Sequence, residues 1–239
     1  MNPFSLMFDR TAFALAYEEC ILCLDSPTPT QQKALKKCCE LRIRGSSGNS
    51  VYTLKRDVNL RAPAGGGKTH MAITIAKHTL LADTKGRCVL FVAQHEALAY
   101  YVARWLYIRL RSECDGQELL ERFAQFHVLF APEAVEKETD ESRRRARLQR
   151  ARFIIEDGEL SMVPIDDVYY HDYALVIVDE AQTLFRDQVA EVLKQWIRRH
   201  VWNLDVAGSA TATLVLDRDY DEINANPMAK HEFSRQLVQ

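Results

Sequence analysis

Short apolar runs alternate along the chain with longer stretches in which apolar residues recur every three to four positions. The short runs predict strands at residues 58–61, 88–93, 127–130, 174–178 and 203–207. The periodic stretches predict helices at residues 9–24, 30–41, 67–82, 96–111, 117–126 and 185–200. The run at 174–178 is continuously apolar, which is typical of a strand buried on both faces. The alternation predicts an α/β fold of three layers, in which a mainly parallel sheet is flanked by helices.

Two segments depart from this alternation. Residues 42–57 predict a hairpin around a Gly-Ser-Ser-Gly-Asn turn. Residues 133–152 are acidic first and then basic, which predicts a solvated helix whose charges suit the helix dipole, with a nucleic-acid contact as the alternative. We therefore expect an N-terminal helical and hairpin extension at 1–57, an α/β domain at 58–216 with a charged helical insertion near 133–160, and a tail at 217–239.

Composition and charge narrow the class of protein. Of 239 residues, 47% are hydrophobic and 27% are charged, which excludes wholesale disorder. The net charge of -2 argues against a protein that coats nucleic acid. We find neither a run of the roughly 20 apolar residues that span a bilayer nor a secretory signal, so we expect no membrane partner.

The six cysteines do not suggest a disulfide scaffold in a chain of this length. Cys20 and Cys23 form a C-x-x-C pattern, and Cys38 and Cys39 follow, so zinc ligation is conceivable. Both groups lie among apolar residues at helical spacing, and we predict buried thiols instead. An intracellular location, cytoplasmic or nuclear, follows as the expectation.

The strongest chemical signal is the segment Ala-Pro-Ala-Gly-Gly-Gly-Lys-Thr at residues 62–69. It follows a predicted strand and begins a predicted helix, so its backbone amides and the helix N-terminus would face an anion together. The segment resembles the Walker A motif of P-loop NTPases, with Ala62 in place of the first glycine. The resemblance implies a nucleotide site in which Lys68 reaches the β- and γ-phosphates and Thr69 binds Mg²⁺. The nucleotide-binding residues would be Ala64, Gly65, Gly66, Gly67, Lys68, Thr69 and His70.

A second signal is the apolar strand at 174–178, which delivers Asp179 and Glu180 at its C-terminal end. Ligands of open α/β sheets bind at such strand ends. The strand and its acids resemble Walker B, which implies that Asp179 binds Mg²⁺ and that Glu180 activates the attacking water. Residues 179–182 read DEAQ and resemble motif II of superfamily 1 helicases, which implies that Gln182 senses the γ-phosphate or couples it to bound nucleic acid.

Three further segments resemble helicase motifs. Residues 209–211 read SAT, similar to motif III of superfamily 2 helicases, which implies a coupling or sensor role for Ser209 and Thr211. Gln31 matches an upstream Q motif that reads adenine, although an ordinary glutamine near a helix start is an equal alternative. Gln94 and His95 resemble motif Ia, which grips nucleic acid, and a plain strand-to-helix turn is as good an interpretation.

Together these motifs cover roughly residues 28–215 and resemble the first RecA-like domain of a superfamily 1 helicase. The resemblance implies ATP and Mg²⁺ as cofactors, and single-stranded DNA or RNA as partner. Since about two dozen residues follow motif III, we expect a second RecA-like domain or a protein partner to supply an arginine finger, and weak ATPase activity without it. The alternatives are a nucleotide-dependent switch or scaffold that acts on a protein partner, and a small-molecule kinase, which the 111-residue separation of Lys68 and Asp179 disfavours.

Overall fold

The computed structural model describes most of the chain between residues 27 and 218. The described residues are 16, 20, 27–44, 49–55, 57–63, 65–83, 85–130, 148–156, 158–166, 171–180 and 211–218. The predicted helices at 9–24 and 185–200 and the predicted strand at 203–207 lie outside these ranges, apart from residues 16 and 20.

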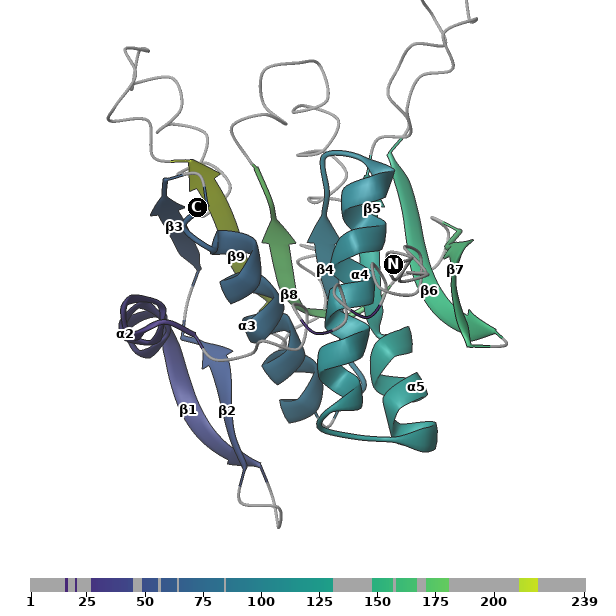
Figure 1. Cartoon of the computed structure of the whole chain (residues 1–239), viewed down its shortest axis with the longest axis horizontal. Coiled ribbons are helices and arrows are strands. Elements are labelled where there is room, and N and C mark those ends of the chain that lie inside the picture. The colour runs from purple at the N-terminus through teal and green to yellow at the C-terminus, as the bar shows by residue number, and fades with distance from the viewer. Residues whose placement is uncertain are drawn as a thin grey trace, which may run out of the picture.

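A seven-stranded sheet in the order β3-β9-β8-β4-β5-β6-β7 forms the centre of the molecule (Figure 1). The first five strands in this order are parallel, and β6 and β7 add an antiparallel edge. The strands are β3 (Val58–Ala62), β4 (Cys88–Val92), β5 (Phe126–Phe130), β6 (Gln149–Glu156), β7 (Glu159–Pro164), β8 (Tyr173–Val178) and β9 (Ala212–Arg218). The mainly parallel α/β sheet predicted from the sequence is confirmed.

Three helices cover one face of this sheet: α3 (Lys68–Ala82), α4 (Glu96–Arg111) and α5 (Gly116–Ala124) (Figure 1). All residues of β4, β5 and β8 are buried. Successive side chains of a strand point to opposite faces, so complete burial means that both faces of the central strands are covered. The continuous apolar run that predicted β8 reflects this environment.

The N-terminal extension consists of α2 (Pro29–Cys38) followed by an antiparallel hairpin of β1 (Cys39–Arg44) and β2 (Asn49–Leu54). Helix α2 begins with a capping box, in which the side chains of Thr28 and Gln31 bond each other's backbone N–H groups. It ends where Cys39 adopts an extended conformation and starts the hairpin. Strand β2 packs against α3, and the rings of Tyr52 and His78 meet edge to face at 5.2 Å. The predicted hairpin is confirmed.

The predicted charged helix is wrong over its C-terminal part, because residues 149–156 form β6 and residues 159–164 form β7. Ala151 and Phe153 of β6 are buried and Arg152 between them is exposed, a period-two pattern. The arginines concealed this pattern in the sequence. The sequence pattern also does not predict β9, which includes residues 217 and 218 of the predicted tail.

The described cysteines are free thiols. Cys39 and Cys88 are buried, and Cys38 and Cys114 are partly buried. Cys20 is exposed, so the prediction of a buried thiol is wrong there, and Cys23 lies outside the described residues. No helix in the described part of the chain is long and apolar enough to cross a membrane.

Candidate nucleotide-binding site

A glycine-rich loop joins the end of β3 to the start of α3. Gly65 and Gly67 have φ angles of 75° and 78°, in the left-handed region that L-residues with a Cβ rarely adopt. Gly67 is the N-cap of α3 and offers no side chain to cap it. The first amides of this 15-residue helix and its positive dipole end are therefore left for an anion that binds at the loop.

Lys68 is the first residue of α3 and is only 6% exposed. Its Nζ donates hydrogen bonds to the carbonyl oxygens of Ala62 at 2.9 Å and Pro63 at 3.1 Å. The ammonium group is thus held over the loop that precedes it. This placement gives the loop a buried positive charge next to its backbone amides.

Thr69 joins the loop to the acidic end of β8. Its Oγ1 donates a hydrogen bond of 3.0 Å to Oδ2 of Asp179, 110 residues further along the chain. The parallel strands β3, β9 and β8 lie side by side, so the segments that follow β3 and β8 meet at the same edge of the sheet. The backbone N–H of Asp179 also donates a hydrogen bond of 3.1 Å to the carbonyl of Val92, which connects the end of β8 to the end of β4.

The carboxyl group of Asp179 is almost completely buried, with 1% exposure. Burial raises its pKa, and the nearby carboxylate of Glu180 acts in the same direction. The hydrogen bonds from Thr69 and from the Glu180 backbone, together with the charge of Lys68, oppose this increase. A buried oxygen ligand with incomplete charge compensation is suited to a hard divalent cation such as Mg²⁺.

Glu180 follows Asp179 in an uncommon backbone conformation, with a φ of 47°. Among the described residues, it alone has a positive φ without being glycine. Its backbone N–H donates to Oδ1 of Asp179 at 2.9 Å, which stabilises the turn. Non-glycine residues in this region cost about 1 kcal/mol or more, and such strain concentrates at functional sites.

Gln31 lies against the glycine-rich loop. Its Oε1 accepts a hydrogen bond of 2.9 Å from the Thr28 backbone, and its Nε2 donates one of 3.4 Å to the carbonyl of Gly66. A Cβ atom at Gly67 would overlap the Gln31 amide, so the close approach of α2 depends on glycine at that position. The structure therefore places Gln31 at the loop, and its reading of adenine stays a prediction.

Gln94 and His95 are exposed at the C-terminal end of β4, next to the end of β8. The imidazole Nδ1 of His95 accepts a hydrogen bond of 3.1 Å from the backbone of Leu98 and caps α4. This contact gives His95 a structural role beside the predicted grip on nucleic acid. His70, in the first turn of α3, packs its ring 5.6 Å from that of Trp105.

Thr211 does not lie with this group, and its coupling or sensor role stays a prediction. Its Oγ1 donates a hydrogen bond of 2.7 Å to the carbonyl of Tyr173, at the start of β8. Asp179 follows the opposite end of that strand, about 20 Å away at 3.3 Å per residue. Thr211 has this position because it immediately precedes β9. Ala64, Gln182 and Ser209 lie outside the described residues.

Sequence reasoning also missed what lies beside the loop. The register of β3 and β9 pairs Ala62 with Arg218, so the end of β9 borders the start of the glycine-rich loop. The apolar, β-branched run at the start of β9 was the signal that could have identified this strand.

The family comparison fits this arrangement. The family model of the DEAD/DEAH box helicase matches residues 28–218, which includes α2, the glycine-rich loop and β9. The chain belongs to the DEAD/DEAH box helicase family. A search of curated proteins found no match to the chain.

Membership of the DEAD/DEAH box helicase family identifies the sheet and its loops as a RecA-like, ATP-binding motor domain. ATP use and nucleic-acid binding are properties of this family in general. The switch and small-molecule kinase alternatives are not favoured by this result. Which helicase superfamily each short motif resembles stays a prediction.

Proposed function

We propose that this helicase domain binds ATP with Mg²⁺ between the glycine-rich loop and the end of β8, and hydrolyses the nucleotide there. The observation that carries the proposal is the 3.0 Å hydrogen bond from Thr69 to Asp179. It brings a hydroxyl and a buried carboxylate, both oxygen ligands that Mg²⁺ prefers, to the start of a helix that favours phosphate.

The residues at this edge of the sheet have different proposed roles, which follow from their chemistry. The loop amides and Lys68 neutralise phosphate charge, while Thr69 and Asp179 hold the metal. When bound, Mg²⁺ stabilises charge on the phosphate oxygens. Glu180 adjoins the metal ligand and acts as the group that orients and deprotonates the attacking water. The left-handed backbone conformation of Glu180 sets the direction in which its side chain leaves the main chain.

We further propose that the ATPase rate is low until a second RecA-like domain or a protein partner supplies an arginine. Such an arginine is worth roughly 10³- to 10⁵-fold in rate in comparable NTPases. Single-stranded nucleic acid is the proposed activator, and Gln94 lies exposed just after β4, the strand beside β8. Nucleic acid there would lie on the same sheet edge as the nucleotide, which suits coupling between the two.

The test separates binding from hydrolysis with two variants. Lys68→Ala should weaken ATP binding at least about tenfold, because it removes the buried charge at the phosphates. Glu180→Gln should keep ATP affinity within about threefold and reduce the rate by 10²-fold or more, because general-base catalysis contributes about that much. Lys85→Ala and Glu121→Gln are matched controls on exposed residues elsewhere and should change neither quantity.

Nucleic-acid dependence is measured with single-stranded RNA and DNA homopolymers. Gln94→Ala should reduce the stimulation, whereas Gln117→Ala on the exposed face of α5 should not. An unchanged ATP affinity in Lys68→Ala would refute the site. A Glu180→Gln variant that hydrolyses ATP at the normal rate would refute the assignment of the base.

A further inference from the structure

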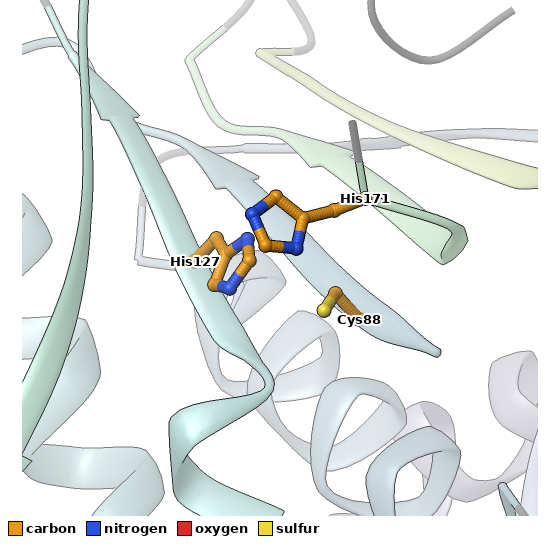
Figure 2. A group of neighbouring side chains, drawn as sticks. All are labelled: Cys88, His127 and His171. Carbon is orange, nitrogen blue, oxygen red and sulfur yellow. The ribbon is translucent and has the colours of Figure 1, made fainter. Parts of the chain in front are cut away.

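A second group of chemically reactive side chains lies at the opposite edge of the sheet. Cys88 begins β4, His127 is the second residue of β5, and His171 lies just before β8. These are the N-terminal ends of parallel strands, whereas the glycine-rich loop and Asp179 lie at the C-terminal ends. Figure 2 shows the two imidazole rings next to each other, with the sulfur of Cys88 beside them, and the rings meet nearly edge to face at 4.6 Å.

The three side chains are close enough to share one ion. Each offers one ligand atom, and the three atoms lie within 4.8 Å of one another. Ligands of a tetrahedral zinc ion at 2.0–2.3 Å are about 3.5 Å apart, so the side chains need to close by about 1 Å. Within the ranges that the structure describes, this is the one such group of cysteine, histidine and acidic residues.

Two further observations point to a ligand. Nε2 of His171 is buried and has no hydrogen-bond partner among the described residues. A buried polar atom without a partner is costly, and a metal ion would satisfy it. Nδ1 of His127 lies 3.0 Å from the hydroxyl of Tyr173. Histidine ligands of metals are commonly oriented by such a hydrogen bond on the ring.

The charges around the group are compatible with a metal that binds nitrogen and sulfur. Burial lowers the pKa of His127 to about 3, with His171 and Arg150 acting in the same direction, so the ring stays neutral and can donate a lone pair. Burial, together with Asp172, raises the pKa of the Cys88 thiol to about 11, so metal binding has to displace its proton. Arg150 donates hydrogen bonds to the carbonyl of Asp166 at 2.7 Å and to Tyr173 at 3.3 Å, which hold its positive charge near these groups. This charge opposes a bound cation, but it also favours the Cys88 thiolate, because it lowers the pKa of the thiol against the effect of burial.

We propose that Cys88, His127 and His171 bind one Zn²⁺ ion, with a water molecule as the fourth ligand. Mixed imidazole and thiolate ligands favour zinc over Mg²⁺ or Ca²⁺. On binding, the Cys88 thiol releases its proton to solvent and the thiolate coordinates the metal. The ion would join the starts of β4 and β5 to the segment that enters β8, so it would act as a structural link at the edge opposite the nucleotide. This site is independent of the proposed ATPase function.

Metal binding by the whole chain is the readout. Protein stripped with a chelator is titrated with Zn²⁺ in competition with a coloured indicator, and with Co²⁺ as a spectroscopic probe. We expect one equivalent of Zn²⁺ to bind and to raise the unfolding midpoint. Co²⁺ should give the sulfur-to-metal charge-transfer band of a cysteine ligand.

The variants test each ligand against a matched residue elsewhere. His171→Asn is the mildest change, because His171 is only half-buried, and it should weaken Zn²⁺ binding at least about tenfold. Cys88→Ser should abolish the charge-transfer band. Cys39→Ser removes another buried thiol and His78→Asn another partly buried imidazole, and neither should change metal binding.

Circular dichroism checks that each variant is folded. If Cys88→Ser does not fold, His171→Asn still decides the test. Less than about one tenth of an equivalent of Zn²⁺ in the wild type would overturn the proposal. So would a folded His171→Asn that binds Zn²⁺ as tightly as the wild type. ATP binding is not a readout, so neither result bears on the nucleotide site.

Discussion

The contact between Gln31 and the glycine-rich loop makes a quantitative prediction about two neighbouring glycines. Gly65 and Gly67 have almost the same left-handed φ, 75° and 78°. Around Gly65, nothing lies within 4 Å of the position of a Cβ atom, whereas at Gly67 the Cβ would overlap the side-chain amide of Gln31. Alanine at either position has the same backbone penalty, but only Gly67→Ala displaces Gln31.

The two penalties can be estimated separately. A left-handed conformation costs an L-residue about 1–2 kcal/mol, and part of this is offset because alanine restricts the unfolded chain. We therefore expect Gly65→Ala to lower the free energy of unfolding by about 1 kcal/mol. Gly67→Ala should lose about 1 kcal/mol more, because the Gln31 amide has to leave the Gly66 carbonyl and the Thr28 backbone.

Urea denaturation followed by tryptophan fluorescence, without nucleotide, measures both losses. A double-mutant cycle with Gln31→Ala isolates the contact. The coupling energy between Gln31→Ala and Gly67→Ala should be about 1 kcal/mol, and that between Gln31→Ala and Gly65→Ala should be within about 0.3 kcal/mol of zero. Equal losses for the two glycines, with no coupling at Gly67, would refute the placement of α2 against the loop.

Three further predictions concern polar groups away from the loop. Burial alone would raise the pKa of Asp83, but hydrogen bonds from the Lys85 and Arg87 backbones and the Arg87 side chain lower it below 3.8. Asp83→Asn should therefore lower the free energy of unfolding by about 2 kcal/mol at pH 7. In urea denaturation at decreasing pH, the difference in stability between wild type and variant should shrink as the pH falls from 3.8 through the lower pKa that Asp83 has in the folded protein. Glu113→Gln should cost about 1–2 kcal/mol, measured in urea, because the Lys77 side chain is 4% exposed and its ammonium group donates to Glu113 at 3.1 Å. Tyr173→Phe should cost about 1–3 kcal/mol in the same assay, because it removes the hydroxyl beside buried His127.

The sequence predicts well those helices and strands whose spacing of apolar residues matches the faces that are buried in the structure. The 16 residues of α4 begin and end where the 3.6-residue period predicts, at 96 and 111. The continuous apolar run of β8 indicates a strand buried on both faces, and its acidic end indicates a ligand site. The glycine-rich loop and Asp179 could be predicted to meet because parallel strands present their carboxyl ends at one edge.

The parts that were missed depend on pairing with distant residues. Strand β6 contains arginines at alternate positions, and only its pairing with β5 shows that Arg150 is buried. A three-residue motif does not show where its residues lie in the sheet, and only the hydrogen bond from Thr211 to the Tyr173 carbonyl places Thr211 at the start of β8. Cys88 and His127 are 39 residues apart in sequence, on different strands, so no spacing pattern could have joined them.

The nucleotide site has a consequence for how ATP would bind. The groups proposed to bind it already make hydrogen bonds: Lys68 bonds the carbonyls of Ala62 and Pro63, and Thr69 bonds Asp179. Phosphate therefore competes with backbone carbonyls for the ammonium, and a metal ion competes with a hydroxyl proton for the carboxylate. Hydrogen bonds to charged groups contribute about 1.5–3 kcal/mol each, so this exchange lowers the net affinity well below the sum of the new contacts. The buried carboxylate of Asp179 acts in the opposite sense, because a divalent cation relieves the unfavourable burial that raises its pKa. We therefore expect ATP and its metal to bind more tightly together than either alone, since only the two together would compensate both the buried ammonium of Lys68 and the buried carboxylate of Asp179.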